Sequence, residues 1–588
     1  MKVYGIDLGT TNTCISTFVD GKPEMITIDN APTFPSIVAW DGEQILVGIA
    51  AKNYSFLSPQ SAVRSIKRKM GQLDFRATLG DRQLSPIDIS AEILRYAAHK
   101  AEEATGEEVK KVVITVPAWF GDEQRRATME AGTVAGLDVL RIINEPTAAG
   151  LTYQLAHSSN SQPTKEHWLI YDLGGGTFDV SVLQVSGDYK EVLASAGNTF
   201  LGGDDFDRLL VQHIVTQVRD RQNLDLNEDE IAMAQIRHQA EQCKIALSTE
   251  AEFELKATIQ VHQQPVLIDM TIERSEFEEM ILDLIESTIN KVEQALSDAK
   301  LDKSQIDRVI LVGGSSRIPL VQEKLRTALN ISPEFYVDPD LSVAMGACIQ
   351  AALVVGLSCQ QIVVDICPHT LGIATLGEMD SDPESMIDRD YPLTFAPLIQ
   401  RNSRLPAKMT RTFYKIAPLQ ETVEIVVLQG ESARTDDNKL IGRFMCPLER
   451  NSDLDFHVSF SYDINGIIQI SVSQHHGQQQ LRQYTMNTNK SVAWNSEEPS
   501  IPTDQDLVLD TEASGVDEDQ QVSNYLLQKI ESELQKFSAS EQSEVRAKVS
   551  AYREALSEQD DERLDELESQ LYDWLEKTES FEVPHGPE

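Results

Sequence analysis

The first 358 residues alternate short β-branched apolar runs with longer stretches in which apolar residues recur at three- and four-residue spacing. Runs such as 112–116 and 309–312 predict buried strands, and the longer stretches predict helices that cover the sheets. This rhythm is typical of an α/β domain. Segment 343–357 is almost unbroken apolar, but Gln350 interrupts it and small residues dominate it. We therefore expect a buried helix between lobes there and not a membrane span.

The periodicity changes after Asp365. Polar and apolar residues then alternate with period two in 423–427 and in 454–462. The turn sequence Asp-Ile-Asn-Gly at 463–466 favours a tight hairpin, and alternation resumes at 468–472. These features predict an antiparallel β-sandwich.

The C-terminal region starts with a stretch rich in Pro, Ser, Asp and Glu, from about 491 to 520, which indicates a linker. Apolar positions at helical spacing follow from 525 onward and predict three amphipathic helices with an acidic, solvated surface. The predicted parts are an α/β domain at 1–358, an interdomain linker at 359–367, a β-sandwich at 368–490, and an acidic linker with helices at 491–588.

At 588 residues the chain is too long for a single core, so several domains are expected. Its 51 basic and 93 acidic side chains give a net charge of -42. Such a field repels nucleic acid and anionic lipid, so neither is an expected partner. The six cysteines form no CxxC pair, and no zinc site or disulfide framework is indicated. Asp7 interrupts any apolar stretch that a secretory signal would need, so we expect a cytoplasmic protein.

One motif occurs twice. The segment Ile-Asp-Leu-Gly-Thr-Thr at 6–11 recurs as Tyr-Asp-Leu-Gly-Gly-Gly-Thr at 171–177, which suggests a duplicated lobe. Glycines let the backbone approach a phosphate, and threonine hydroxyls and N–H groups donate hydrogen bonds to it. Asp7 and Asp172, each ending a strand, would face each other across a cleft and hold a hydrated Mg²⁺. No Walker loop is present.

Two further glycine pairs fit the same chemistry. Gly202 and Gly203 precede an acidic segment, and Gly313 and Gly314 directly follow the predicted strand 309–312. Glycine turns of this kind suit the phosphates and sugar of a nucleotide.

Taken together, these motifs closely resemble the ATPase domain of the seventy-kilodalton heat-shock chaperones, the DnaK-like proteins of the actin and sugar-kinase superfamily. The segments that carry the resemblance are GIDLGTTNT at 5–13, VPAWFGDEQRRAT at 116–128, RIINEPTAA at 141–149, DLGGGTFDVSV at 172–182, FLGGDDFD at 200–207 and LVGGSSRIP at 311–319. The resemblance extends over nearly the whole chain. It implies an α/β, actin-like, two-lobed ATPase domain, then an antiparallel β-sandwich and a short C-terminal helical lid.

The resemblance also implies a nucleotide site for ATP or ADP with Mg²⁺, and K⁺ as a further candidate ion. Lys67 would stabilise charge on the γ-phosphate and hold the attacking water, while carboxylates orient that water and the metal's shell. The catalytic group is Lys67, Glu145, Asp172, Thr177 and Asp7, with Asp7 and Asp172 holding the metal through water. The cofactor-binding group is Gly9, Thr10, Thr11, Asn12, Gly174, Gly175, Gly176, Asp179, Gly202, Gly203, Glu241, Lys244, Ser248, Gly313, Gly314, Ser315, Arg317 and Asp340.

For two of these assignments, the residues alone also allow a structural role without function. Lys67 also fits an exposed basic helix. Glu241, Lys244 and Ser248 share one helix face, which also fits a solvated stripe.

The second half resembles the peptide-binding sandwich of the same chaperones, on segments 365–373, 402–406, 428–431 and 463–466. Such loops bind an extended peptide by backbone hydrogen bonds and an apolar pocket. By resemblance the pocket would use Leu376, Phe413, Ile416 and Val423, although each also fits a core position. Coupling would run through the linker and through Arg141 and Asp365, a surface for J-domain cochaperones. The implied partners are unfolded or specific client polypeptides, a J-domain cochaperone and a nucleotide exchange factor.

Some features depart from the usual family pattern. The linker at 360–365 is less acidic and less leucine-rich, an acidic insertion occupies 377–394, and the lid is short. These traits resemble a specialised bacterial branch, the HscC type. The predicted function is an ATP-dependent chaperone in which slow hydrolysis gates the binding and release of extended apolar segments. The alternatives are a small-molecule kinase of the actin superfamily, an actin-like polymer former and a low-turnover regulatory binding protein.

Overall fold

The computed structural model describes residues 2–156, 165–261, 264–335, 337–357, 361–376, 393–415, 421–448, 455–476 and 479–486, and, near the C-terminus, 542, 545–552, 563, 567 and 571. The chain divides into two compact units, Met1–Leu509 and Asp510–Glu588. The finer domain boundaries given above stay a prediction. In the second unit, residues 545–552 are helical, and Val545, Val549 and Tyr552 are buried at the predicted helical spacing. The rest of the predicted C-terminal helices lies outside the described residues.

A mixed sheet in the order β11-β10-β1-β2-β3, with β4 beside β2, forms the centre of the first lobe. Its strands are β1 (Tyr4–Leu8), β2 (Asn12–Val19), β3 (Lys22–Met25), β4 (Phe34–Pro35), β10 (Lys111–Val116) and β11 (Asp138–Asn144). The apolar residues of these strands pack with α2 (Pro86–Thr105) and α3 (Asp122–Val134) into one core. Ser85 and Asp88 form a capping box that starts α2.

Smaller elements complete this lobe. They are β5 (Val38–Trp40), β6 (Ile45–Val47), α1 (Ile49–Tyr54), η1 (Pro59–Ser61), β7 (Ala62–Val63), η2 (Ile66–Lys69), β8 (Ala77–Leu79) and β9 (Arg82–Leu84). β6, β5 and β7 make a three-stranded sheet, and β8 and β9 make a hairpin.

The second lobe repeats the plan with the order β17-β12-β13-β14-β18. Its strands are β12 (Lys165–Leu173), β13 (Phe178–Ser186), β14 (Tyr189–Asn198), β17 (Arg308–Val312) and β18 (Ile362–Val364). β1 pairs antiparallel with β2 and parallel with β10, and β12 pairs antiparallel with β13 and parallel with β17. Asp7 and Asp172 each occupy the last position but one of the equivalent strands β1 and β12. The duplication predicted from the repeated motif is confirmed.

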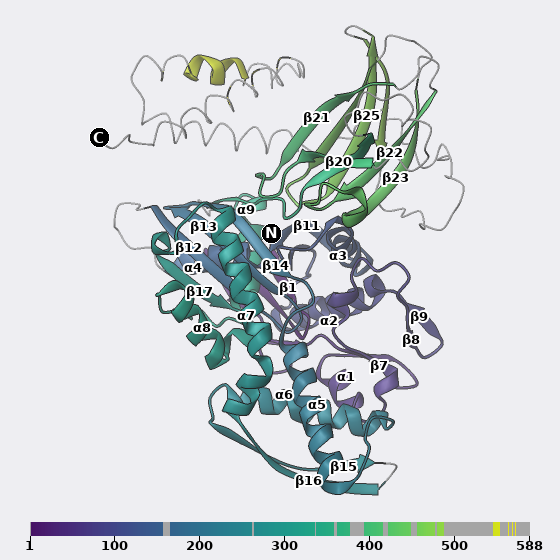
Figure 1. Ribbon diagram of the computed structural model, residues 1–588, viewed down its shortest axis with the longest axis vertical. Helices are drawn as coiled ribbons and strands as arrows, with labels where there is room; N and C mark the ends of the chain where they lie inside the picture. The colour runs from purple at the N-terminus through teal and green to yellow at the C-terminus, as the bar shows by residue number, and fades with distance from the viewer. Residues whose placement is uncertain are drawn as a thin grey trace, which may run out of the picture. The chain divides into compact units, whose positions relative to one another are not determined.

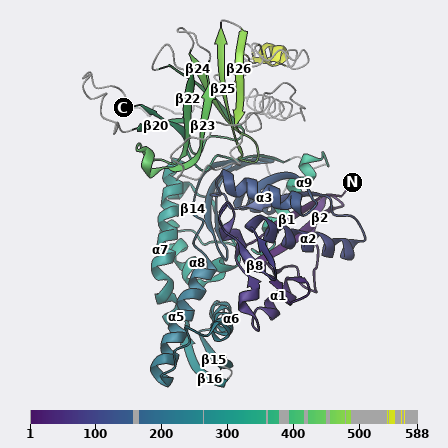
Figure 2. The same ribbon diagram turned by 90° about the vertical axis from the view of Figure 1, so that its right-hand side faces the viewer.

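Helices cover both lobes, and a hairpin extends the second one. The remaining helices are α4 (Glu145–Ala156), α5 (Gly203–Gln222), α6 (Glu230–Leu247), α7 (Arg274–Asp298), η3 (Lys303–Gln305), η4 (Gly314–Arg317), α8 (Pro319–Leu329) and α9 (Ser342–Val354). The hairpin of β15 (Glu252–Val261) and β16 (Gln264–Glu273) lies with α5 and α6 (Figures 1 and 2).

α9 is the buried helix that the apolar segment 343–357 predicts. It packs against α4 and the first sheet, and Gly346 approaches the backbone of Ala148 so closely that a Cβ there would lie 1.8 Å from its carbonyl oxygen. Small residues in this helix therefore serve close packing. None of the helices in the part of the chain that the structure describes is long and apolar enough to cross a membrane.

After β18 the chain forms a sandwich of two four-stranded sheets, β20-β19-β22-β23 and β21-β24-β25-β26. The strands are β19 (Leu371–Leu376), β20 (Leu393–Ile399), β21 (Ala407–Phe413), β22 (Thr422–Gln429), β23 (Lys439–Pro447), β24 (Phe456–Tyr462), β25 (Ile468–His476) and β26 (Gln479–Met486), with η6 at Thr435–Asp437. Neighbouring strands pair antiparallel around one apolar core, as expected. At the β24–β25 hairpin, the Asp463 carboxylate accepts from the Asn465 and Ile467 amides, and Gly466 has φ 69°.

Candidate functional site

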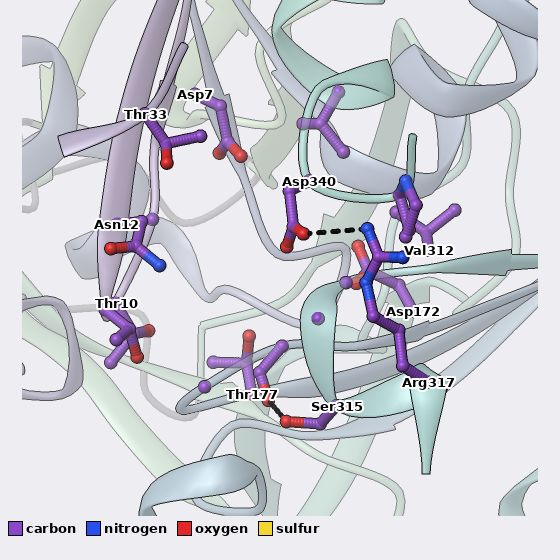
Figure 3. Close-up of a pocket in the computed structure, with 18 of the residues that line it drawn as sticks. Asp7, Thr10, Asn12, Thr33, Asp172, Thr177, Val312, Ser315, Arg317 and Asp340 are labelled. Atoms are coloured by element: carbon purple, nitrogen blue, oxygen red, sulfur yellow. Dashed lines mark hydrogen bonds and ion pairs between the residues drawn. The ribbon is translucent and has the colours of Figure 1, made fainter. Parts of the chain in front are cut away.

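A cavity of about 300 Å³ opens between the two lobes at the ends of β1 and β12. Asp7, Thr10 and Asn12 reach it from the first lobe, and Asp172 and Thr177 reach it from the second (Figure 3). The predicted nucleotide residues in its lining are Asp7, Gly9, Thr10, Thr11, Asn12, Lys67, Glu145, Asp172, Gly174, Gly175, Thr177, Glu241, Lys244, Ser248, Gly313, Gly314, Ser315, Arg317 and Asp340. Segments far apart in the chain therefore meet in one cleft.

Four predicted residues lie behind the lining. They are Gly176, Asp179, Gly202 and Gly203. A Cβ on Gly202 would lie 2.6 Å from the Gly175 carbonyl carbon, so this glycine packs directly against the second hairpin. Asp179 pairs with Asp172 across β12 and β13 and accepts a hydrogen bond from the Trp119 amide at 3.1 Å.

The two Asp-Leu-Gly hairpins touch each other. A Cβ on Gly175 would lie 1.9 Å from Thr11 Oγ1, and one on Gly176 would lie 2.4 Å from Thr10 Cγ2. No larger residue fits at this crossing. The Thr11 hydroxyl is buried and has no hydrogen-bond partner among the described residues. A buried hydroxyl beside bare backbone suits a phosphate oxygen, since a buried donor without an acceptor is costly.

At the floor of the cleft, one cation faces several carboxylates. Lys67, on η2, is buried and donates its ammonium to the Glu145 carboxylate. Burial works to lower the pKa of Lys67, but Glu145 and Asp7 outweigh it and raise that pKa. Lys67 is therefore a buried cation and not part of an exposed basic helix.

Burial raises the pKa of three carboxylates in this part of the structure, and Glu145 adds to the effect. Burial, with Glu145 adding to it, raises the pKa of Asp7 to about 6 and the pKa of Asp172 well above its ordinary value. Burial also raises the pKa of Asp179 to about 7. Asp7 is oriented by the Thr115 hydroxyl, which donates to it at 2.8 Å. This excess of negative charge around one lysine is compensated most simply by a bound cation.

The donor set fits Mg²⁺ held through water. Among the described residues, no group of three or more His, Cys, Asp or Glu side chains is placed to hold a metal directly. Mg²⁺ dehydrates reluctantly and uses one or two carboxylates together with water and substrate phosphates. Asp7 and Asp172, on opposite walls of a cleft lined by phosphate-type hairpins, meet that requirement.

On the second lobe, Glu241, Lys244 and Ser248 all line the cleft from one face of α6 and its C-cap, so they are not a solvated stripe. Lys52 of the first lobe donates to Glu241 across the cleft at 3.1 Å. Burial works to raise the pKa of Glu241, but the Lys52 charge outweighs it and lowers that pKa. Lys244 donates to Asp207 at 2.8 Å.

The opposite wall comes from the turn after β17. Gly313 has φ 77°, and a Cβ there would lie 2.5 Å from the Leu173 carbonyl oxygen, so the turn requires glycine. The Ser315 hydroxyl donates to the Gly174 carbonyl at 3.0 Å, which ties this turn to the second hairpin. Arg317 lines the cleft and donates to Asp340 at 3.1 Å (Figure 3).

The sequence did not single out every lining residue. Cys14, Thr33, Ile245, Val312, Ile318, Pro339 and Val343 also line the cavity. Lys52 and Arg64 escaped notice as well, although both reach Glu241 from the other lobe, Arg64 at 3.7 Å. Cys14 and Thr33 carry no motif of their own, but Cys14 directly follows the first hairpin and is in register with Asp7. Its position opposite Asp7 in the hairpin could have indicated that Cys14 lies near the cavity.

Comparison with known proteins agrees with this geometry. The family model described as "Hsp70 protein" matches residues 3–582. The chain is also 41% identical over 479 residues to the chaperone protein DnaK of Mycoplasma mycoides subsp. mycoides, which covers 80% of this chain and 77% of that protein. The chain belongs to the Hsp70 family. It is therefore an ATP-hydrolysing, ATP-dependent chaperone with a two-lobed, actin-like ATPase part and a β-sandwich. The kinase alternative has no support.

In this Hsp70, the sandwich contacts the first lobe through its β24–β25 hairpin. The Asp122 carboxylate accepts from the Ile468 amide at 2.7 Å, and Arg126 donates to the Ile468 carbonyl. The buried Arg125 donates to the Asn465 carbonyl at 3.1 Å. Polar backbone groups of one turn are thus held by α3, the helix that follows the VPAWF segment.

The linker of this Hsp70 joins the sheet of the second lobe. β18 pairs parallel with β14, placing Ile362, Val363 and Val364 opposite 189–191. Asp365 follows directly, is buried, and accepts from the Thr147 hydroxyl at 3.0 Å. Arg141 donates to the Ile464 carbonyl at 3.4 Å, and burial lowers its pKa, with the Asp365 charge opposing. Both predicted coupling residues therefore lie where linker, lobe and sandwich meet.

The predicted peptide-binding residues are only partly placed. Phe413 ends β21 and stacks on Phe456 at 5.9 Å between ring centroids. Val423 lies in β22 and packs against the sandwich core, and Leu376 is the last residue of β19. Ile416 and most of the acidic insertion, 377–392, lie outside the described residues.

Proposed function

We propose that ATP with Mg²⁺, and K⁺ as a further ion, binds in the cleft between the lobes and that its hydrolysis controls how the sandwich holds extended apolar segments of client proteins. The observation that carries this proposal is the meeting of the two Asp-Leu-Gly hairpins from equivalent strands over the buried Lys67. The γ-phosphate of a bound ATP would then lie next to the Lys67 ammonium.

The residues divide the work by position. Thr10, Thr11, Thr177 and the hairpin amides would cradle the phosphates. Lys67 would offset charge that grows on the γ-phosphate, and its ion pair with Glu145 keeps it aimed at the cleft. Positioning and preorganised charge account for this kind of phosphoryl chemistry. Asp7 and Asp172 would hold the metal's water shell, and bound Mg²⁺ would neutralise phosphate charge.

The nucleoside would bind between α6 and the turn after β17. Glu241, Lys244 and Ser248 supply polar groups on one side, and Gly314 and Arg317 lie on the other. The Lys52–Glu241 pair closes the cleft from lobe to lobe, so it would slow nucleotide release.

The link to the sandwich would be a two-state equilibrium. In one state β18 lies against β14 and Asp122 holds the Ile468 amide. Hydrolysis would favour release of these contacts and retention of peptide, which is a population shift. Leu376, Phe413, Ile416 and Val423 remain our candidates for the peptide pocket, and residues 491–588 our candidate lid.

Partners and setting follow from the family. We propose client polypeptides, a J-domain cochaperone acting near Arg141 and Asp365, and a nucleotide exchange factor, in the cytoplasm. The linker at 360–365, which has few acidic residues and no leucine, and the acidic insertion at 377–394 favour the specialised, HscC-type branch.

Single-turnover hydrolysis by the full chain tests the proposal. An extended apolar peptide should accelerate hydrolysis, and Thr177→Ala should slow hydrolysis while nucleotide still binds. Thr78→Ala, on the exposed β8–β9 hairpin, is the matched control and should leave the rate unchanged. If the peptide leaves the rate unaltered, the coupling is wrong, and a low-turnover binding protein becomes the better description.

A further inference from the structure

A second cavity, of about 410 Å³, lies where both lobes meet the sandwich. The first lobe lines it with Arg68 and Trp119, and Phe200, just after β14, lines it from the second lobe. Gln429, the last residue of β22, and Lys439, the first residue of β23, line it from the sandwich. This cavity shares no lining residue with the nucleotide cleft, and its volume is in the range of sites for small organic ligands.

Two buried hydrogen-bond donors in this lining have no acceptor among the described residues. Gln429 is only 6% exposed, and its Nε2 lacks a partner within the part of the chain that the structure describes. The same holds, over those residues, for Trp119 Nε1. A buried N–H without an acceptor is costly, and buried donors in native proteins are almost always satisfied. One donor belongs to the first lobe and the other to the sandwich, so a molecule in the cavity that carries acceptor atoms would satisfy both.

Contacts with the sandwich and with α7 hold the Trp119 ring in place. The His369 ring meets it edge-on with 4.9 Å between the ring centroids, and the Lys291 ammonium lies 5.2 Å from its centroid. The His369 Nε2 also donates to the Trp119 carbonyl at 3.2 Å. Because the ring is already fixed, a ligand that accepts from its N–H costs little side-chain freedom.

The charges of the lining favour an anion. Arg68 and Lys439 are cations, Glu123 is the only acidic residue in the lining, and burial lowers the pKa of His369 to about 4, so that ring is neutral at pH 7. Lys439 donates to Glu123 at 2.7 Å, and Arg68 is paired with Asp205, which lies outside the lining. A bound amine would therefore meet two cations and one carboxylate that is already paired. A carboxylate meets both cations and the two unsatisfied N–H groups.

The other lining residues are uncharged, and several are apolar. Met70, Trp119 and Phe200 supply apolar surface, and Phe200 is 59% exposed although its side chain is large and apolar. Covering such a surface with the apolar part of a ligand is favourable. The lining thus suits a molecule with an apolar body and an acidic end.

We propose that this cavity binds a small organic acid, whose aromatic or aliphatic body packs on Phe200 and whose carboxylate accepts from Trp119 and Gln429. Because both lobes and the sandwich line the cavity, the bound acid stabilises their contact. Arg68 also donates to the Gly176 carbonyl of the second phosphate hairpin at 2.9 Å, which connects the cavity to the nucleotide cleft. The effect on domain contact rests on the two-state equilibrium proposed above, whereas the binding site does not. By linkage, the acid weakens peptide retention by the factor by which peptide weakens binding of the acid.

Calorimetric titration of the full chain tests the site. The probe is 3-phenylpropionate, and 3-phenylpropylamine is a cation of the same size. With the nucleotide cleft filled by Mg²⁺ and a non-hydrolysable ATP analogue, the acid should bind and the amine should not. Trp119→Phe, which keeps a ring and removes the N–H, and Gln429→Met should each weaken binding of the acid about tenfold or more. Thr78→Ala, on the β8–β9 hairpin, is the control and should leave the affinity unchanged.

Two further measurements locate the bound acid and its effect. In protein labelled with ¹⁵N-tryptophan, the Trp119 indole resonance, identified by its loss in Trp119→Phe, should move when the acid is added. Exchange of the Ile468 amide, which reports contact between the sandwich and the first lobe, should slow by up to about tenfold at an acid concentration of ten times the Kd. The docked fraction from the same exchange corrects the affinities of the variants.

An unaltered affinity in Trp119→Phe or in Gln429→Met, equal binding of the amine, or no binding of the acid would overturn the site. A moved Trp119 resonance without slower Ile468 exchange would overturn the effect on domain contact. Peptide-stimulated hydrolysis is measured in parallel. If stimulation is absent while the acid binds, the proposed function fails and the site stands; if stimulation occurs while no acid binds, the site fails and the proposed function stands.

Discussion

Lys67 and Glu145 form an ion pair at the floor of the cleft, and both side chains are almost completely buried. They come from η2 and the start of α4, and both side chains line the cavity. A buried pair of this kind fixes the position of its cation, whatever its net contribution to stability.

Replacing Lys67 with Met should reduce single-turnover hydrolysis by about 10²–10³-fold while nucleotide binding persists, because charge on the γ-phosphate loses its partner. Glu145 would also be left buried without a counter-charge, at a cost of about 3–5 kcal/mol in unfolding free energy. The double variant with Glu145→Gln should recover stability but not hydrolysis. A Lys67→Met protein that hydrolyses ATP at the normal rate would contradict the assigned role.

Gly176→Ala should push the two phosphate hairpins apart, because its Cβ would lie 2.4 Å and 2.6 Å from Thr10 atoms. We expect a loss of about 1–3 kcal/mol in unfolding free energy and weaker ATP binding. Gly174→Ala is the control in the same hairpin, since its Cβ meets nothing closer than 3.6 Å. Equal unfolding free energies for the two variants would show that the hairpins do not meet as described.

His369 makes the unfolding free energy of the protein depend on pH below about 6.5. Its Nε2 donates to the Trp119 carbonyl at 3.2 Å, and burial lowers the pKa of His369 from 6.5 to about 4. The unfolded chain therefore takes up the proton first, so stability is complete above pH 6.5 and falls as pH drops toward 4, by up to about 1.4 kcal/mol per pH unit.

The difference in unfolding free energy between the wild type and His369→Gln, followed from pH 7 to 4.5, isolates this contribution. His99→Gln, an exposed histidine, is the control. A difference that stays constant with pH would mean that His369 is solvated.

Asp122→Ala should weaken contact between the sandwich and the first lobe, because the buried Ile468 amide loses its acceptor. The expected cost is about 1–3 kcal/mol, seen as reduced peptide stimulation of hydrolysis and faster exchange of the Ile468 amide. Glu123→Ala breaks an exposed pair with Lys439 at the same contact and should cost at most about 1 kcal/mol. Similar effects of the two variants would mean that the hydrogen bond from the Ile468 amide to Asp122 does not hold the contact.

Local chemistry explains what the sequence could predict. The repeated Asp-Leu-Gly motif located both hairpins because glycine is required by the backbone crossing itself. Predicted strands 112–116 and 309–312 are observed as β10 and β17, each one polar residue longer at its start. A polar residue can join a ladder at the end of a strand without joining the core, so the apolar pattern does not mark it.

Residues whose role depends on distant neighbours escaped. Lys67 was located by the resemblance alone, since its burial beside Glu145 leaves no mark in the periodicity. Lys52 was missed, because it matters only where α6 faces it across the cleft. Lys190 is buried in β14, where it contacts Gln361 of a linker that follows 171 residues later in the sequence. Such placements follow from the assembled fold, and periodicity carries no trace of them. The roles of Phe413 and Val423 in binding peptide stay a prediction.

The pairing of β18 with β14 also bears on how a protein that handles unfolded chains protects itself. Once the linker departs, β14 offers a row of unpaired backbone groups to which an extended polypeptide can add, including the linker of a second copy. Lys190 lies at the centre of that row, and a lysine on an exposed strand edge opposes such an addition. The docked linker covers this edge, and Lys190 would guard it against aggregation once the linker has left.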